Sequence, residues 1–464
     1  MVKSGPFKSP IRNMSNNRRV FLKNLGIAGA AASVMPSLAF SAENKKSEFI
    51  KREVTGFPTA AKEIKLGLIG AGIMGTQDAE TALSHDNIKL VAVCDLYTGR
   101  LEEAKARWGE DLFITKNYSD LLNRKDIDAV IIGTTDHWHK QISIDALKAG
   151  KHVYCEKPMV HSVEEGHEVI DAWKKSGKVF IIGSQGMSSL GNEKAKELLK
   201  EGAIGELNYA EGFWARNSPT GAWQYHIPED ASPATVDWKK YISNTEKRPF
   251  DAERFFRWRN YLDYGTGMSG DLFVHLFSSL HFITDSLGPN QISATGGLRY
   301  WKDGREVPDV LLGMFDYPKT EAHPPFNLSL RCNFVDGTSG STYLKLVGSK
   351  GSMDVKWDEV VVKRNENTGQ DDPFLAEQEK RENLRQPDRK KINPPLETVY
   401  TAERGYKGAH YDHFANFFHA IRTNGTVAEN PVFGFRAAAP ALLCNDSYRK
   451  EKFIKWDPVN MKIV

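Results

Sequence analysis

A short apolar segment that runs into a glycine-rich turn constrains this chain more than any other feature. In "EIKLGLIGAGIMG" (residues 63–75), Gly70, Gly72 and Gly75 stand in G-x-G-x-x-G register where a strand ends and a helix begins. The three glycines permit, in turn, a tight turn, close approach of the backbone to a pyrophosphate, and close packing of helix on strand. The N-terminus of the helix adds free N–H groups and the positive end of its dipole. The turn, with Ile73 and Met74, therefore predicts a dinucleotide site; the alternative is a structural turn that binds no phosphate.

Asp95 supports the dinucleotide interpretation. It ends the next apolar run, "KLVAVCD", at a distance from the glycines where a carboxylate accepts hydrogen bonds from the adenosine ribose. Because its negative charge repels a 2′-phosphate, the expected cofactor is NAD. Arg100 leaves NADP open, since a nearby arginine accommodates that phosphate, although Arg100 also suits a solvated helix position.

Apolar runs alternate with helical patterns through the first part of the chain. A parallel strand that is buried on both faces has such a nearly continuous apolar run. Five of these runs are present: "IKLGLIG", "KLVAVCD", "DAVIIGT", "HVYCEK" and "VFIIGSQ". Strand, helix and strand repeated in this way predict a doubly wound, Rossmann-type parallel sheet over residues 62–184.

Residues 185–464 show a different period. Segments such as "NYAEGFWAR", "DVLLGMFDY" and "FNLSLRCNFV" alternate polar and apolar residues, which is typical of an antiparallel sheet with one packed and one open face. Residues 365–397 predict a long surface loop, and two helical patterns close the chain. The predicted fold class is α/β, with a Rossmann domain followed by an α+β domain whose large open sheet is mostly antiparallel. Two domains suit a chain of 464 residues, which is too long for one ordinary core.

The first 42 residues predict a targeting signal. Arg18 and Arg19 precede a short Ala/Gly-rich apolar run that is too short to span a membrane, and Ala39 and Ser41 supply small residues for cleavage. The paired arginines resemble a twin-arginine export signal, with an ordinary secretory signal as the alternative. Either signal predicts an exported, periplasmic protein. The polar segment 43–61 is expected to form an arm over the cofactor.

Composition excludes several classes of function. A net charge of +3, with both signs interspersed, predicts neither nucleic-acid binding nor a membrane-surface patch. The cysteines lie far apart without a C-x-x-C pair, which argues against a zinc site and against a disulfide framework. We expect no metal site, and buried free thiols at Cys94, Cys155, Cys332 and Cys444.

A glutamate, a lysine and a proline follow one of the apolar runs, at Glu156, Lys157 and Pro158. The carboxyl ends of such strands are where α/β sheets bind ligands, and the proline favours an extended Lys157 whose ammonium points into the cleft. Together with "GAGIMG", "CDLYTGR", "TDHWHKQISIDALKAGKHVYCEKP" and "GDLFVH", this segment makes nearly the whole mature chain resemble the Gfo/Idh/MocA oxidoreductase family. The signal, "DHWH", "RWRNYLDYGTG" and "KWDP" resemble the exported, sugar-acting members.

The resemblance implies roles for three residues. Lys157 lies near the nicotinamide and stabilises the developing alkoxide, His275 is the base, and Asp271 orients a hydroxyl or the imidazole. A histidine, with an ordinary pKa of about 6.5, suits a base at neutral pH. Asp271 and His275 share one face if they lie on a helix, although such a pair is often only a surface pair. Ser278 stands where many members have an aspartate, which leaves the contacts with substrate hydroxyls in doubt.

The resemblance also implies the wider site. The predicted cofactor-binding residues are Gly70, Gly72, Ile73, Met74, Gly75, Asp95, Thr134, His139, Glu156 and Lys157. The predicted substrate-binding residues are Lys157, Trp258, Arg259, Tyr264, Asp271 and His275. Further candidates without firm roles are His137, His226 and Arg257. Aromatic residues gather in the same segments, as pyranose-stacking surfaces or as core: Trp214, Trp223, Tyr225, Trp238, Trp258, Tyr261 and Tyr264.

Three functions are compatible with these residues. The favoured one is an NAD(P)-dependent oxidoreductase that acts on a sugar or glycoside with a tightly bound cofactor. The second is a glycoside hydrolase or lyase that oxidises a hydroxyl transiently, eliminates and returns the hydride; the resemblance implies that this branch lacks the lysine present here as Lys157. The third is a cofactor-retaining binding protein without turnover. The family further implies a homodimer or homotetramer formed through the open sheet.

Overall fold

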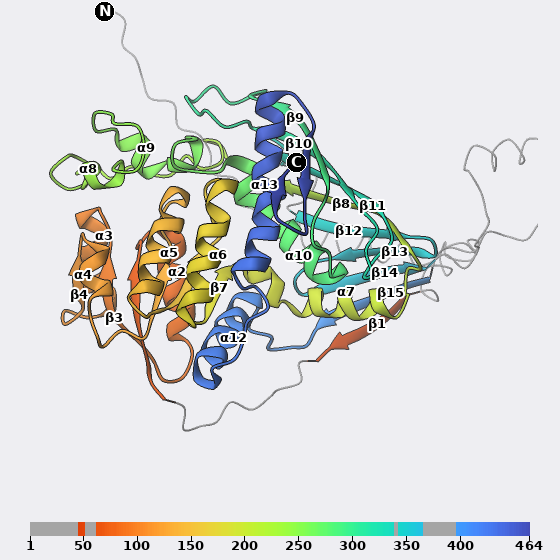
Figure 1. The fold of residues 1–464 in the computed structure, drawn as a ribbon, viewed down its shortest axis with the longest axis horizontal. Coiled ribbons are helices and arrows are strands. Elements are labelled where there is room, and N and C mark those ends of the chain that lie inside the picture. The colour runs from red at the N-terminus through yellow and green to blue at the C-terminus, as the bar shows by residue number, and fades with distance from the viewer. Residues whose placement is uncertain (1–44, 52–61, 338–341, 365–395) are drawn as a thin grey trace, which may run out of the picture. The chain divides into compact units, whose positions relative to one another are not determined.

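The computed structural model describes residues 45–51, 62–337, 342–364 and 396–464. The predicted export signal, residues 1–42, lies outside the described residues. Residues from Lys46 onward form one compact unit that contains two sheets, one of six strands and one of eleven (Figure 1).

The six-stranded sheet is parallel and carries the glycine-rich turn. Its order is β4-β3-β2-β5-β6-β7, so the strand order reverses between β2 and β5, the point where α/β sheets bind ligands. Every residue of β5 and β7 is buried, which explains their continuous apolar runs. The strands are β2 (Ile64–Ile69), β3 (Ile88–Cys94), β4 (Phe113–Thr115), β5 (Ala129–Ile132), β6 (His152–Glu156) and β7 (Phe180–Gly183).

Helices connect these strands as the sequence pattern predicts. Helix α6 shows how local chemistry sets an element: a capping box between Ser162 and Glu165 opens the preceding 3₁₀ turn, and Gly177, at φ 63°, ends the helix in the left-handed region. The helices are α2 (Ile73–Leu83), α3 (Thr98–Trp108), α4 (Tyr118–Leu122), α5 (His139–Lys148) and α6 (Gly166–Ser176), with 3₁₀ turns η2 (Asp136–Trp138) and η3 (Val163–Glu165).

The eleven-stranded sheet is mixed. Its order is β1-β15-β14-β13-β12-β8-β11-β10-β9-β16-β17, and β8 and β11 run parallel, whereas their other partners run antiparallel. Burial alternates along β10 and β11, so one face packs and the other is open. The strands are β1 (Lys45–Ile50), β8 (Leu207–Ala215), β9 (Gln291–Gly297), β10 (Val310–Tyr317), β11 (Phe326–Asn333), β12 (Thr342–Gly348), β13 (Gly351–Val355), β14 (Glu359–Arg364), β15 (Leu396–Ala402), β16 (Ile454–Asp457) and β17 (Lys462–Ile463).

Three long helices cover the packed face of this sheet: α7 (Leu190–Lys200), α10 (Val274–Thr284) and α13 (Pro431–Lys450) (Figure 1). Short elements join the two sheets: η4 (Gln185–Ser188), α8 (Trp238–Tyr241), α9 (Ala252–Phe256), η5 (Trp258–Asn260) and η6 (Ser269–Phe273), the last a π-helical turn that leads into α10.

Helix α12 (Ala409–Thr423) follows the large sheet in the chain but packs on the parallel sheet. Phe414 stacks on Tyr154 of β6 with ring centroids 4.3 Å apart, and Phe417 and Phe418 complete this core. The ring of His413 contacts the carbonyl of Ile182 in β7 at 2.8 Å. The last part of the chain therefore holds the two sheets together.

The predicted fold class is confirmed, with three local differences. The sequence pattern did not show the three-residue strand β4. It also did not show β15, which begins at the end of the predicted loop 365–397. Residues 365–395 of that loop lie outside the described residues. In the predicted arm, residues 45–50 form β1 beside β15, and residues 52–61 lie outside the described part. Within that part, no helix is long and apolar enough to cross a membrane, and all four cysteines are buried and free, as expected.

Candidate active site

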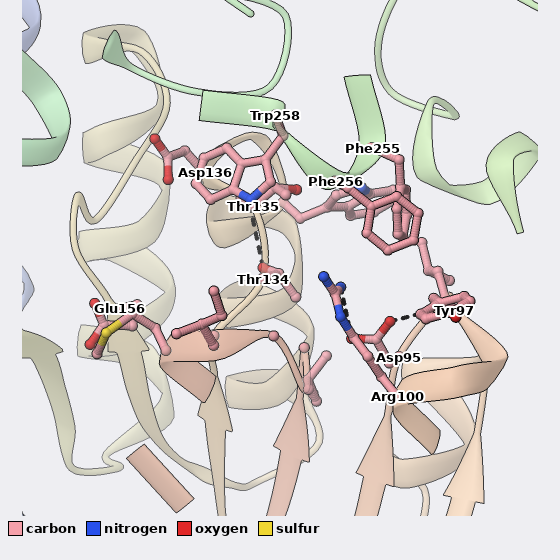
Figure 2. A pocket seen from close by; sticks show the side chains of 18 of the residues that line it. Asp95, Tyr97, Arg100, Thr134, Thr135, Asp136, Glu156, Phe255, Phe256 and Trp258 are labelled. Atoms are coloured by element: carbon pink, nitrogen blue, oxygen red, sulfur yellow. Dashed lines mark hydrogen bonds and ion pairs between the residues drawn. The ribbon is translucent and has the colours of Figure 1, made fainter. Parts of the chain in front are cut away.

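A cleft of about 560 Å³ opens at the carboxyl ends of β2, β3, β5 and β6. This volume suits a small organic ligand or cofactor. One wall is the edge of the parallel sheet, and the opposite wall comes from the segment between β8 and α10. Figure 2 shows Asp95, Tyr97 and Arg100 on one side of the pocket and Glu156 on the other, with Phe255, Phe256 and Trp258 across from the strand ends.

The glycine-rich turn fits a pyrophosphate. Gly70 has φ 92°, in the left-handed region that favours glycine. A Cβ on Gly72 would meet nothing closer than the Arg100 guanidinium at 3.9 Å, so its backbone faces open space in the cleft. A Cβ on Gly75 would lie 1.9 Å from the Gly70 carbonyl oxygen, so Gly75 serves close packing and does not line the cleft. Helix α2 starts without a side-chain cap, which leaves its first N–H groups for a ligand.

Asp95 lies at the adenosine end of the cleft and is held by the backbone. Its carboxylate accepts hydrogen bonds from the N–H groups of Ala71 and Tyr97, both at 2.9 Å. Arg100 lies 3.6 Å from the same carboxylate, and its guanidinium sits over the rings of Phe255 and Phe256. Each carboxylate oxygen retains lone pairs for a ribose hydroxyl.

An aromatic segment faces the glycine turn from the other wall. Phe255 and Phe256 close helix α9, and Trp258 opens the following 3₁₀ turn. This segment is fixed to the parallel sheet through a bridge between Tyr97 and Val236 and through packing of Tyr97 on Phe256. A dinucleotide in the cleft would therefore lie between the sheet edge and this aromatic wall.

At the other end of the cleft, three charged residues converge. The Lys157 ammonium donates to the carbonyl and to Oδ1 of Asp271, both at 2.8 Å, and the Arg259 guanidinium donates to the same Oδ1 at 3.1 Å. Burial raises the pKa of Asp271, but Lys157 and Arg259 outweigh burial and hold it well below its usual value. Removing one partner of such a buried pair typically costs about 3–5 kcal/mol.

His275 lies one helical turn beyond Asp271 and also lines the cleft. Its ring stacks on Trp214 of β8 with centroids 5.4 Å apart, and Trp357 approaches from the other side at 6.1 Å. Within the described residues, neither ring nitrogen forms a hydrogen bond, and Nδ1 is buried. Burial, reinforced by the charge of Lys157, lowers the pKa of His275 well below 6.5. The ring is therefore neutral at neutral pH and free to accept a proton.

The other predicted cofactor residues line the middle of the cleft. His139 contacts two carbonyl oxygens, those of Pro158 at 2.7 Å and Thr134 at 3.2 Å, so it ties the loop after β5 to the end of β6. Burial raises the pKa of Glu156 well above 4.5, and its Oε1 accepts a hydrogen bond from the Gln185 amide at 2.7 Å. The Lys157–Pro158 peptide is cis.

The structure does not bring every candidate to the cleft. Tyr264, predicted to bind substrate, is fully buried in an aromatic cluster with Tyr241 and Trp238 and does not line the cleft. His137 belongs to the same cluster through its contact with Tyr241. Trp223 is a core residue as well. Of the aromatic candidates, Tyr225 and Trp258 line the cleft.

Two further sequence interpretations take a different form in the structure. Asp271 lies on a π-helical turn and His275 on α10, so a local change of helical pitch separates them; such turns are frequent at functional sites. Ser278 has an acidic residue beside it after all, because its hydroxyl donates to the carboxyl group of Glu429 at 3.1 Å. Glu429 is fully buried behind the site and does not line the cleft.

The cleft also contains residues that the sequence did not single out. Arg216 directly follows β8 and lines the substrate end, while Phe255 and Phe256 line the adenosine end. Arg216 was detectable in principle, since an arginine closes the alternating run "NYAEGFWAR". The sequence around Arg216 does not indicate that this end of β8 lies at the cleft.

Comparison with known families agrees with this geometry. Residues 64–184 match the model described as "Oxidoreductase family, NAD-binding Rossmann fold", and residues 196–456 match "Oxidoreductase family, C-terminal alpha/beta domain". The fold and the cleft thus define an oxidoreductase scaffold with an NAD-binding Rossmann domain. The chain belongs to the Gfo/Idh/MocA oxidoreductase family.

Two curated relatives have different printed activities. Inositol 2-dehydrogenase from Salmonella typhimurium is 32% identical over 145 residues, 31% of this chain and 43% of that protein. Alpha-N-acetylgalactosaminidase from Shewanella oneidensis is 30% identical over 232 residues, 45% of this chain and 50% of that protein. The chain spans about half the length of the curated relatives it matches.

Solved structures share the fold at lower identity. Levoglucosan dehydrogenase in complex with NADH superposes with a TM-score of 0.61 at 19% identity, covering 85% of this chain and 99% of that one. Aldose–aldose oxidoreductase from Caulobacter crescentus, complexed with glycerol, gives 0.61 at 16% identity, covering 85% and 100%.

Proposed function

We propose that the protein is an NAD-dependent dehydrogenase that exchanges a hydride between a CH–OH group of a sugar or glycoside and a cofactor that stays bound. The observation that carries this proposal is the convergence of Lys157, Asp271 and His275 at one end of a cleft that begins at the glycine-rich turn. Relatives with this fold are named as dehydrogenases of inositol and of levoglucosan, which supports a polyhydroxylated substrate.

In this proposal each of these residues has a task. A bound nicotinamide supplies the hydride chemistry. The neutral ring of His275 accepts the hydroxyl proton of the substrate. Two of the three N–H donors of the Lys157 ammonium go to Asp271, and the third is left to stabilise the negative charge that develops on the substrate oxygen. Oδ2 of Asp271, which makes no hydrogen bond within the described residues, is left for a neighbouring hydroxyl.

NAD is the proposed cofactor in preference to NADP. The carboxylate of Asp95 lines the cleft at the end of β3, where the glycine motif predicts the ribose hydroxyls, and it would repel a 2′-phosphate. Arg100, which left NADP open in the sequence, lies 3.6 Å from Asp95, so that carboxylate already offsets its charge.

Retention of the cofactor follows from the proposed export. A periplasmic enzyme meets little free NAD, so turnover requires that the cofactor be loaded before export and reoxidised in place by a second substrate or an external acceptor. The aromatic wall of Phe255, Phe256 and Trp258 supports slow release, because it would cover the face of the cofactor that lies away from the sheet.

The deciding experiment uses enzyme purified with its cofactor. Absorbance of the reduced nicotinamide is recorded while a panel of sugars and glycosides is added. We expect a rise that persists until an acceptor is added. Absence of any lasting rise, with release of a monosaccharide from a glycoside, would contradict net oxidation.

That second outcome would support a transient-oxidation glycoside hydrolase. The specific observation in its favour is the 30% identity with an alpha-N-acetylgalactosaminidase. The presence of Lys157 weighs against a hydrolase, because the glycosidase branch is expected to lack this lysine. Here its ammonium forms an ion pair with Asp271 in the cleft.

The open face of the large sheet supports a homodimer or homotetramer. Leu312 and Met314, on β10, are 40% and 63% exposed on this face. Apolar side chains of this size on an open sheet suit contact with a second copy. Size-exclusion chromatography with light scattering tests this proposal, and a monomer at micromolar concentration would contradict it.

A further inference from the structure

The substrate end of the cleft carries more positive than negative charge. Its lining residues include three cations, Lys157, Arg216 and Arg259, and two carboxylates, Asp136 and Asp271. Asp271 is shared by Lys157 and Arg259, while Asp136 accepts hydrogen bonds from the backbone and hydroxyl of Thr266. Burial raises the pKa of Glu156 well above 4.5, which disfavours the charged form of this carboxyl, so we leave it out of the charge count. One unit of positive charge therefore remains.

Of these three cations, Arg216 is the one that pairs with no carboxylate of the described chain segments. Within the described residues, its guanidinium forms no hydrogen bond or ion pair, whereas the other two cations both contact Asp271. Its exposed side chain lines the cleft together with Tyr225 and His226.

The position of Arg216 follows from the register of β8. The backbone N–H of Arg216 donates to the Asn333 carbonyl at 3.1 Å, which continues the ladder with β11 beyond the end of the strand. Residues two apart on a strand share a face, so Arg216 points the same way as Trp214, and Trp214 stacks on His275. Arg216 therefore lies beside the proposed base, and its charge contributes to lowering the pKa of both His275 and Asp271.

Resting on the proposed dehydrogenase function, we propose that the substrate is an anionic sugar whose carboxylate pairs with Arg216, that is, a hexuronic acid or a hexuronoside. A substrate that fills the cleft displaces water, and an arginine left there without a partner would be destabilising. The planar guanidinium binds a carboxylate through two parallel hydrogen bonds. A single surplus charge matches a monoanion better than a phosphate dianion.

The same pairing would assist the chemistry. A carboxylate on Arg216 offsets the charge that acts on His275, and the ring becomes a stronger base when this substrate is bound. A neutral sugar leaves Arg216 unpaired and has no such effect. Substrate charge and proton transfer are thereby coupled through one residue.

The test compares matched pairs of sugars on the cofactor-loaded, full-length enzyme. D-Glucuronate is compared with D-glucose, D-galacturonate with D-galactose, and each methyl uronoside with the neutral methyl glycoside, using reduction of the bound cofactor as the readout. We expect kcat/KM to be at least about tenfold higher for the acid of the preferred pair. Glucose 6-sulfate forms a separate arm: a preference for it over glucuronate would overturn the carboxylate as the group that Arg216 binds and identify a sulfate ester instead. Equal or better use of every neutral partner would overturn the proposal.

Variants locate the effect at Arg216. Arg216→Gln is expected to raise KM for the acid by about 10- to 100-fold, since it removes a charge-assisted hydrogen bond, and to bring the ratio of kcat/KM for the acid to kcat/KM for the neutral partner close to one. Arg216→Lys keeps the charge but loses the planar fork, so its KM for the acid should lie between the values for the unaltered enzyme and for Arg216→Gln. Arg449→Gln on α13 removes the same charge from an exposed position and is the matched control. Equal losses for acid and neutral sugars in Arg216→Gln would overturn the proposal.

Calorimetry separates this proposal from the proposed function. If no sugar reduces the cofactor but glucuronate or galacturonate binds, and Arg216→Gln abolishes that binding, the anionic site stands and net oxidation fails. If neutral sugars reduce the cofactor while no anionic sugar binds, oxidation stands and the anionic site fails. If no anionic sugar binds or reacts at all, the anionic site is likewise rejected.

Discussion

The two ends of the cleft are built in different ways. At the cofactor end, the phosphate cradle is backbone: a glycine turn and the first N–H groups of α2, with the Asp95 side chain held by two backbone N–H groups, all within 30 residues of one another in the chain. At the substrate end, the contacts come from side chains of three distant segments, with Lys157 and Asp271 separated by 114 residues.

This difference separates binding of a common cofactor from recognition of a particular substrate. A backbone cradle tolerates changes in the surrounding side chains, which suits a cofactor that is common to a family. A charged cluster depends on the placement of each side chain, so it is where relatives that share the fold can differ in substrate. Variants at the two ends should therefore fail in different ways.

The largest effect is expected at the substrate end. Lys157→Met should lower the rate of cofactor reduction by about 10³-fold, because it removes the cation that stabilises the developing alkoxide. Affinity for NADH should stay within about twofold, since the glycine turn is untouched. Stopped-flow absorbance and NADH fluorescence titration measure the two quantities. Lys174→Met, at an exposed position of α6, is the control, and undiminished turnover in Lys157→Met would reject the site assignment.

His275→Asn should lower the rate by about 10²-fold through loss of the base. The pH profile gives a sharper test. The unprotonated ring is the active form and its pKa is lowered, so kcat/KM should hold as the pH falls through 6.5 and decline only below that value. His275→Asn should lack this acidic limb. A limb centred at or above pH 6.5 would contradict the assignment.

At the cofactor end, two glycines should respond oppositely. Gly72→Ala adds a Cβ in open space, so folding stability should be unchanged while NADH affinity drops about tenfold through contact with the pyrophosphate. Gly75→Ala places a Cβ against the Gly70 carbonyl and should lower the free energy of unfolding by about 1–3 kcal/mol. Calorimetric titration measures the NADH affinity, and chemical denaturation measures the free energy of unfolding. Equal effects of the two substitutions on both quantities would contradict the assignment of Gly72 to binding and Gly75 to packing.

The smallest effect is expected at Asp95. Asp95→Asn keeps the shape and one oxygen acceptor but removes the charge, so the ratio of NADPH to NADH dissociation constants should fall about five- to tenfold. Arg100→Gln should leave NADH affinity nearly unchanged and should weaken NADPH binding relative to the unaltered enzyme. Parallel fluorescence titrations with the two cofactors measure the ratio, and an unaltered ratio in Asp95→Asn would mean that another group sets the preference.

The features that could be predicted are those set by residues close together in the chain. The buried runs of β5 and β7 and the turn at Gly70 are contiguous in the chain, and their periodicity and glycine spacing are visible there. The packing of Phe414 on Tyr154 joins residues 260 positions apart, and no period in the sequence shows it. Tyr264 illustrates the same limit, since its aromatic neighbours in sequence suggested a ligand wall, but tertiary packing buries it.

By itself, the sequence determined the sheet types, the dinucleotide turn and the residue types available for chemistry, because strands, helices and tight turns depend on side chains that are close in the chain. Only the tertiary structure decided which of those residues share a cleft. It placed Lys157 and Arg259 on one oxygen of Asp271, left Arg216 without a carboxylate partner in the part of the chain that the structure describes, and kept the ring of His275 neutral. Charge pairing and burial depend on distances across the fold, and these exist only once the chain has folded.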